Sequence, residues 1–249
     1  MKGHIRKRGS TWTVVLDVGR DPATGKRQRK WYGGHRTKRD AERFLADTLH
    51  KLNTGAYVEP AKITVAEYLE RWLADYAKTN VSAKTFERYE EIIKKHLIPA
   101  LGGHALAKLQ PLHIQAYYGQ ALQSGRLDGK GGLSAQTVLH HHHILHKALQ
   151  QALRWRLLQH NPAEAVEPPR PKRKEAGVLD EDRVAAILRA VDGTAIYIPV
   201  LLAATTGLRR GEILALRWQD VDLEAGTATI RQSLEQTQAG LRFKEPKTR

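Results

Sequence analysis

The sequence predicts a multidomain α+β protein: a small β-sheet packed on one helix, then an all-α helical bundle, then a mainly helical segment with a β-hairpin. Three observations predict this order. The N-terminal stretch has β-branched and aromatic residues around a turn, the middle shows helical periodicity between caps, and a basic, Pro-rich stretch follows the middle. We expect three domains and two linkers, at residues 1–55, 56–63, 64–166, 167–177 and 178–249.

Composition narrows the class of protein. With 249 residues, of which 41% are hydrophobic, the chain is long enough for several cores. It contains no cysteine, which excludes disulfides and thiolate metal sites. No apolar run approaches the roughly 20 residues that cross a bilayer. We therefore expect a soluble, cytoplasmic protein without membrane contact.

Basic residues are concentrated near the N-terminus. The chain carries a formal net charge of +15, and residues 1–55 alone hold 14 Lys and Arg against 5 Asp and Glu. A field of this sign attracts polyanions. Nucleic acid is the predicted partner, and an anionic membrane surface or simple solubility are the alternatives.

The N-terminal stretch predicts a basic sheet. Strands are expected at residues 11–18 and 27–33 around a turn, a short strand at 4–8 completes the sheet, and a helix begins after Thr37. Such a sheet fits the DNA major groove, whereas a solvated basic sheet is the alternative. In the return strand Arg27 and Arg29 share one face and Lys30 lies on the other. The predicted DNA contacts are Arg8, Arg27, Arg29 and Lys30.

The middle of the chain predicts four helices. Thr64 and Glu67 form a capping box, Ser82 and Pro111 begin the second and third helices, and Ser134 begins a long fourth helix. Apolar residues, tryptophans and tyrosines recur at helical spacing between these starts. They predict the core of a bundle rather than a cofactor site.

The fourth helix contains a run of histidines from His140 to His143, followed by His146. His142 and His146 share a face, but no Cys or Glu joins them, so a metal site is the less favoured interpretation. We expect DNA-facing or exposed histidines that titrate near neutral pH and add positive charge beside a phosphate. The predicted DNA contacts of the bundle are Lys84, Thr85, Arg88, His140, His143 and Lys147.

The last third of the chain is organised around a corner between two helices. Residues 196–205 predict a buried helix, which Gly207 ends in the left-handed conformation, and Arg209 follows at the corner. A guanidinium fixed there is suited to clamp a phosphate, and a structural arginine is the alternative. A strand at 227–232 and a hairpin loop at 237–240 are expected to follow. The preceding basic linker adds two predicted DNA contacts, Lys172 and Arg173.

The stretch from Thr206 to Ile213, followed by Leu216-Arg217-Trp218 and Asp220, resembles the first catalytic-arginine motif of the tyrosine recombinase, or phage integrase, family. In this resemblance Arg209 takes the arginine position and Glu212 the acidic position after it. Residues 178–249 are then similar to the N-terminal part of the family's catalytic domain.

The resemblance continues over the rest of the chain. Ser82 to Thr85, with Tyr89 and His96, and the stretch from Leu133 to Pro162 are similar to the family's helical core-binding domain. Residues 1–55 are similar to its arm-type DNA-binding domain.

The resemblance implies an enzyme that exchanges DNA strands to integrate or excise mobile DNA through a covalent 3′-phosphotyrosine intermediate. A tyrosine attacks the scissile phosphate, two arginines hold its oxygens, and a hairpin lysine, to which Lys247 is similar, protonates the leaving oxygen. The resemblance implies no cofactor or metal. Its implied partners are double-stranded DNA, further recombinase protomers and accessory DNA-bending proteins, in a bacterial or phage-encoded setting.

The sequence departs from the family pattern after Lys247. A second arginine motif and a C-terminal tyrosine have no counterpart, and all eight tyrosines lie at or before Tyr197. We therefore expect a truncated catalytic domain that binds DNA without cutting it. The alternatives are a stand-alone DNA-binding or regulatory module and a relative of type IB topoisomerases, and the coding sequence beyond Arg249 separates the truncated enzyme from the module.

Overall fold

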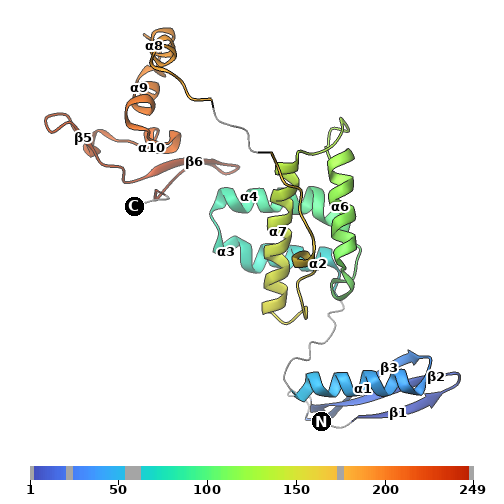
Figure 1. Ribbon diagram of the computed structural model, residues 1–249. Coiled ribbons are helices and arrows are strands. Elements are labelled where there is room, and N and C mark those ends of the chain that lie inside the picture. The colour runs from blue at the N-terminus through green and yellow to red at the C-terminus, as the bar shows by residue number, and fades with distance from the viewer. Residues whose placement is uncertain (1–2, 21–24, 54–62, 173–176, 247–249) are drawn as a thin grey trace.

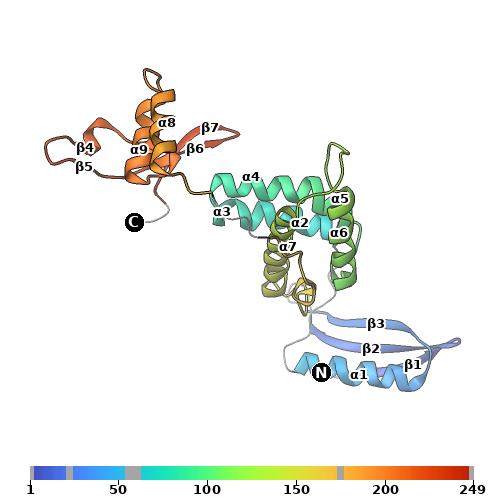
Figure 2. The same ribbon diagram turned by 45° about the horizontal axis from the view of Figure 1, so that its top comes forward.

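The chain forms three consecutive bodies in a computed structural model (Figures 1 and 2). A blue sheet-and-helix body is followed by a cyan-to-yellow helical bundle and an orange-to-red body of helices and hairpins. This is the α+β architecture that the sequence predicts. The structure describes residues 3–20, 25–53, 63–172 and 177–246, without the side chains of 18–20 and 51–53.

The N-terminal body is a three-stranded antiparallel sheet with a helix on one face. Strands β1 (Gly3–Arg8), β2 (Thr11–Arg20) and β3 (Arg27–His35) pair in the order β1-β2-β3. The helix α1 (Lys38–Asn53) packs on this sheet, where its Ala41 is buried against the central strand. The three strands and the helix expected from the sequence are confirmed.

The bundle consists of four helical rods, and the first two change pitch along their length. The first rod comprises α2 (Val65–Trp72), the π-helical turn η1 (Leu73–Ala77) and α3 (Lys78–Asn80). The second comprises α4 (Ala83–Ile92), the π-helical turn η2 (Ile93–Leu97) and α5 (Ile98–Leu101). The third and fourth rods are the single helices α6 (Pro111–Ser124) and α7 (Ala135–Arg154). Two short 3₁₀ turns, η3 (Leu106–Lys108) before α6 and η4 (Pro162–Ala165) after α7, complete the bundle.

The bundle has an aromatic core. Trp72, Tyr68 and Tyr118 are fully buried, and the Tyr68 hydroxyl donates a hydrogen bond of 2.5 Å to the carbonyl of Ala148 on α7. This contact satisfies a buried polar group and connects the first rod to the fourth. Within the described residues, the structure has no helix that is both long enough and apolar enough to span a membrane.

Local caps set where the rods begin, as the sequence predicts. Thr64 Oγ1 accepts the Glu67 N–H at 3.2 Å, and Glu67 Oε2 accepts the Thr64 N–H at 2.7 Å, so both halves of the capping box are present. Ser82 caps α4 and Ser134 caps α7 through their hydroxyls. Because each cap uses only neighbouring residues, the sequence alone was enough to locate these helix starts.

The C-terminal body combines short helices with two hairpins. Its elements are α8 (Glu181–Ala190), α9 (Tyr197–Thr206), α10 (Arg210–Ile213), the 3₁₀ turn η5 (Trp218–Asp220), β4 (Val221–Asp222), β5 (Thr227–Ala228), β6 (Ser233–Thr237) and β7 (Gly240–Lys244). β4 pairs with β5, and β6 pairs with β7, in both cases antiparallel. Gly207 ends α9 with a φ of 67°, which confirms the predicted left-handed cap.

Two predictions for this body are wrong. The helix expected at 196–205 forms as α9, but none of its residues is buried and Ile198 is 57% exposed, because the described residues of α8 and α10 cover only part of it. The strand expected at 227–232 ends at Ala228. The chain leaves the strand there because the Gln232 side chain donates 3.0 Å to the carbonyl of Ala215.

Candidate nucleic-acid interface

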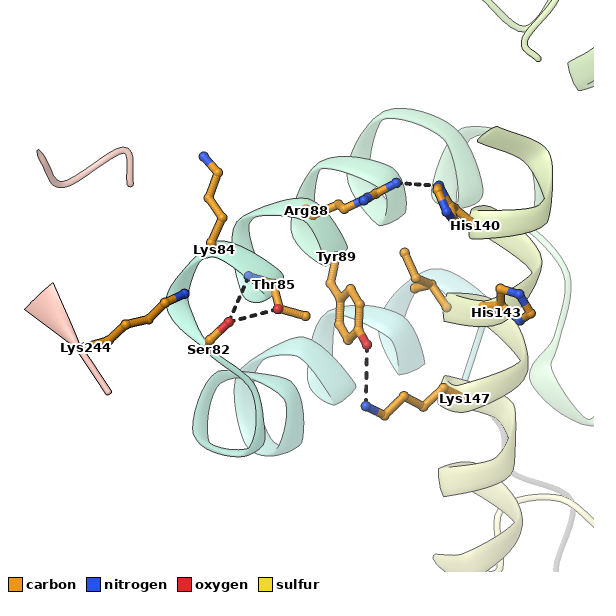
Figure 3. Close-up of a pocket in the computed structure, with 10 residues that line it drawn as sticks. Ser82, Lys84, Thr85, Arg88, Tyr89, His140, His143, Lys147 and Lys244 are labelled. Carbon is orange, nitrogen blue, oxygen red and sulfur yellow. Dashed lines mark hydrogen bonds between the residues drawn. The ribbon is translucent and has the colours of Figure 1, made fainter. Parts of the chain in front are cut away.

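Basic and polar side chains of α4 and α7 line one open pocket of about 430 Å³ (Figure 3). All six DNA contacts predicted for the bundle line it, so two helices distant in sequence contribute to one site. Among the described residues, no Asp or Glu lines the pocket, and its cations come from three elements. The lining residues are Ser82, Lys84, Thr85, Arg88, Tyr89, His140, His143, Ile144, Lys147 and Lys244.

An aromatic stack supports the floor of the pocket. The Tyr89 ring stacks on the buried Trp72 ring, with centroids 5.7 Å apart and planes 24° apart. The Lys147 ammonium donates to the Tyr89 hydroxyl at 3.4 Å and lies 5.5 Å from the ring centroid. The ammonium of α7 is therefore held over the α4 side of the pocket (Figure 3).

Arg88 and His140 connect the two helices at the edge of the pocket. The Arg88 Nη2 contacts the His140 Nδ1, and the His140 Nε2 lies 3.0 Å from the Gln136 side-chain amide. Burial lowers the pKa of His140, and the neighbouring Arg88 charge lowers it further. Both effects favour the neutral imidazole, which can hydrogen-bond without adding a charge to the pocket.

His141 belongs to the core and His142 is half-buried beside it, contrary to the expectation of exposed histidines. His141 is 1% exposed, and its Nδ1 lies 2.6 Å from the Tyr117 hydroxyl, while the Nδ1 of His142 lies 2.8 Å from the Tyr118 hydroxyl. Burial, followed by nearby positive groups, lowers the pKa of both imidazoles to about 4. The described residues contain no cluster of three or more His, Asp or Glu side chains that could hold a metal ion.

These buried histidines predict that the bundle loses stability in acid. In the unfolded chain they bind protons near pH 6.5, but in the folded chain only near pH 4, so the unfolded state binds more protons between these values. The free energy of unfolding is therefore complete above pH 6.5 and falls toward pH 4, by on the order of 3 kcal/mol for His141. Urea unfolding of the full chain, followed by circular dichroism, measures this slope, and His141→Leu with Tyr117→Phe should reduce it. A pH-independent midpoint would contradict the assignment.

The second basic surface is the sheet face that α1 leaves open. Val14 and Leu16 face α1, so strand alternation places Arg6, Arg8 and Arg29 on the opposite face. The exposed Trp31 ring lies among them, with the Arg8 guanidinium 5.5 Å from its centroid. This face thus combines exposed cations with an exposed aromatic ring, which Arg8 contacts.

The structure sorts the four contacts predicted for this sheet. Arg8 and Arg29 are exposed on the open face. Arg27 is exposed too, but its Nε lies 3.1 Å from the Asp17 carboxylate, which offsets part of its charge. Lys30 is half-buried on the face that α1 covers, so the predicted alternation of the strand is confirmed and Lys30 is separated from the other three. The sequence analysis missed Arg6, although its alternation with Arg8 in β1 was a usable signal.

Arg209 and Glu212 form the third cationic site. The Arg209 N–H donates to Glu212 Oε2 at 2.9 Å, and its Nη1 donates to Oε1 at 3.0 Å. The backbone contact and then the side-chain contact lower the pKa of Glu212. Glu212 is 7% exposed, whereas the Arg209 side chain is 62% exposed. A buried carboxylate therefore orients a guanidinium that stays largely in solvent.

Two neighbours hold this corner in place. A Cβ on Gly211 would lie 2.6 Å from both the Leu234 carbonyl oxygen and the Ser233 Oγ, so the absence of a side chain lets α10 approach β6. The buried Asp220 carboxylate accepts the Arg217 Nε at 2.7 Å and lies 3.2 Å from the Arg231 Nε. Arg217 and Asp220, which the sequence shows only as parts of a motif, join the segments around the corner.

The remaining predicted contacts lie outside this geometry. Lys247 and Arg173 fall outside the described residues, and Lys172 is exposed but does not line the pocket. Lys244 does line it, and sequence analysis missed it. Its ammonium contacts the buried Glu235 carboxylate across the β6–β7 hairpin. Because the pocket lies on another body, only the tertiary structure reveals that Lys244 belongs to it.

Comparison with known proteins gives the class of this architecture. Three family models match in sequence order: an arm DNA-binding domain over residues 4–52, a phage integrase N-terminal SAM-like domain over 64–121, and the phage integrase family over 177–247. One match falls on each of the three bodies, and the match in the bundle extends through most of α6. The chain belongs to the phage integrase family of tyrosine recombinases.

Individual relatives agree. A "Tyrosine recombinase XerC-like" protein of Caldanaerobacter subterraneus subsp. tengcongensis is 26% identical over 94% of this chain and 59% of its own length. An integrase of Streptomyces ambofaciens is 27% identical over 89% of this chain and 54% of its own. A lambda integrase dimer bound to a COC′ core site has the same fold, with a TM-score of 0.54 and 20% identity over 97% of this chain and 65% of that one. The chain spans little more than half the length of the Caldanaerobacter and Streptomyces proteins.

Proposed function

We propose that these 249 residues bind duplex DNA as part of a site-specific recombinase that integrates or excises mobile DNA. The observation that supports this most is the pocket between α4 and α7, where four cations of the described chain converge and no described carboxylate lines the wall. Cations in this arrangement neutralise phosphates and release counterions, which is the main source of affinity for DNA. Contacts to phosphate position a protein on the duplex before any base is read.

The sheet of the N-terminal body supplies a second DNA contact. A β-ribbon fits the major groove, where guanidinium groups bond the flanking phosphates and can also reach the O6 and N7 atoms of guanine. Arg6, Arg8 and Arg29 on the open face are placed for such contacts, and Trp31 offers apolar area beside them. This body recognises arm-type sites in the proposal, while the bundle grips the core site.

The corner at Arg209 supplies transition-state binding in the proposed reaction. The guanidinium holds a non-bridging oxygen of the scissile phosphate, and Glu212 keeps it in position through the two contacts above. Lys247 is the proposed general acid for the leaving 5′ oxygen. No metal or other cofactor takes part in this proposal.

We propose further that residues 1–249 alone bind DNA without cleaving it. A phosphotyrosine intermediate needs a phenol that loses its proton on attack. Tyr68, Tyr117 and Tyr118 are buried in the bundle, and burial raises the pKa of each, which opposes that role. None of the eight tyrosines follows Arg209 in sequence, where the family's nucleophile lies.

A covalent-adduct assay tests this part of the proposal. The binding site is first selected from randomised duplexes, and a nicked version then traps any phosphotyrosine product. We expect a retarded complex in native gels and no covalent adduct after denaturation, for the chain of residues 1–249. An adduct in this chain would show that one of its own tyrosines is a nucleophile, and no selectable duplex would refute DNA binding itself. Mass determination of the complex reports whether protomers pair on the site, as the proposal expects, and added DNA-bending proteins test the accessory partners.

A further inference from the structure

The β6–β7 hairpin lies against the start of α4, and one carboxylate makes the contact. Glu87 Oε1 accepts the backbone N–H of Gln238 in the hairpin turn at 2.5 Å. The same carboxylate accepts the Lys84 ammonium at 3.0 Å through Oε2. Glu87 thus bonds at once to the hairpin of the C-terminal body and to a lysine that lines the bundle pocket.

The two hydrogen bonds that the Glu87 carboxylate accepts favour its ionised form. The Gln238 N–H and then Lys84 lower the pKa of Glu87, so it stays ionised at neutral pH. Its side chain is only 15% exposed, in contrast to 57% for Glu91 one turn later in the same rod. A partly desolvated, charge-assisted bond is stronger than one in open solvent. Glu87 therefore brings a negative charge next to the basic pocket without lining it.

The turn of the hairpin presents its backbone to this acceptor. Thr237 pairs with Gly240, so Gln238 and Ala239 form a two-residue loop whose tip faces α4. Gly240 has a φ of 110°, which an L side chain rarely adopts. Ala239 of the tip, together with Ala83 and Glu87, lines a second hollow of about 420 Å³ between the two bodies.

Docking of the hairpin brings its lysine to the pocket. Lys244 belongs to β7, yet its ammonium lies beside Ser82 at the start of α4 (Figure 3). The buried Glu235 holds that ammonium from the opposite strand. The cationic pocket is therefore complete only when the hairpin lies on α4.

We propose that Glu87 is a positioning residue that latches the hairpin onto α4 and so completes the phosphate-binding pocket with Lys244. The proposal rests on the proposed DNA-binding function and adds to it that pocket and hairpin act as one unit. Without the latch the hairpin keeps its packing against α4 but loses the charge-assisted bond that fixes it there, so Lys244 is held less firmly at the pocket. Glu87 itself contacts no DNA, because its charge has the sign of a phosphate.

Engineered cysteines test the latch without DNA, since the chain has no native cysteine. Ala83→Cys with Ala239→Cys places two thiols around the second hollow, and a short bis-maleimide should cross-link them rapidly. Gln120→Cys with Ala239→Cys is the control pair, because Gln120 is exposed on α6. Cross-linking no faster than in this control would overturn the docked hairpin.

Substitution of Glu87 in the Ala83→Cys, Ala239→Cys chain tests whether Glu87 holds the hairpin in place. We expect Glu87→Ala to slow the cross-link roughly tenfold, as loss of a charge-assisted hydrogen bond does. Glu90→Ala is the matched control, because it removes an exposed ion pair with Lys94 on the same helix. An unchanged rate in Glu87→Ala would overturn the latch, and circular dichroism confirms that each variant is folded.

DNA titration then separates this inference from the proposed function. We expect Glu87→Ala and Lys244→Met to weaken duplex binding non-additively, because both remove Lys244 from the pocket. Additive effects would overturn the coupling. If the cross-link forms as expected but the chain binds no duplex, the proposed DNA-binding function fails while the docked hairpin stands.

Discussion

Replacing Arg88 and Lys147 by glutamine is expected to weaken duplex binding roughly a hundredfold at physiological salt. Each side chain supplies a cation to the pocket between α4 and α7, and a charge-assisted contact is worth on the order of 1.5 kcal/mol, which is about tenfold in affinity. Each lost phosphate contact should also lower the slope of log K against log salt by roughly 0.9. Fluorescence anisotropy across a salt series measures both quantities.

The control removes the same charge from positions on the second rod that lie outside the pocket. Lys94→Gln with Lys95→Gln eliminates two cations that pair with Glu90 and Glu91 and do not line the pocket. We expect a small effect from this variant, since exposed ion pairs contribute little. Equal losses in both double variants would mean that only net charge matters and that the pocket is not a binding site.

Removing the N-terminal body is expected to reduce the salt dependence of binding further. Deletion of residues 1–55 takes away Arg6, Arg8 and Arg29 on the open sheet face, and three phosphate contacts correspond to a change in slope of roughly 2.7. The triple substitution of these arginines by glutamine in the intact chain should reproduce most of the change. The same salt series provides the measurement.

Three cations on α1 provide a control that separates the effect of the open sheet face from the effect of net charge. Lys38, Arg39 and Arg43 are exposed on α1, in the same body, and their triple substitution removes the same charge. We expect this variant to keep the native slope, because α1 lies on the opposite side of the sheet. If the two triple variants behave alike, the open sheet face is only a solvated surface.

Local features of the site were readable from the sequence because neighbouring residues decide them. The Arg209–Glu212 contact spans three residues at a helix start, and the Thr64–Glu67 capping box spans the same distance. The left-handed Gly207 is a similar case, since a helix end needs that conformation whatever packs around it.

Packing decided the features that sequence analysis misjudged. His141 and His142 look polar in a helix with apolar neighbours, but α7 turns them toward Tyr117 and Tyr118, and burial removes their charge. The apolar residues of α9 show the opposite case, because they were expected to be buried and are not. Hydrophobicity predicted a buried helix, but burial requires a partner surface, which the described neighbours of Ile198 do not provide.

By itself the sequence determined the order of the three bodies, the starts of their helices and the excess of basic charge, because caps, periodicity and composition act over a few residues. Only the tertiary structure decided which cations share a site. Lys84 and Lys147 meet because α4 packs beside α7, and Lys244 joins them because Glu87 holds the hairpin turn. The physical reason is that convergence of charge depends on long-range packing, and no local pattern specifies which distant segments become neighbours.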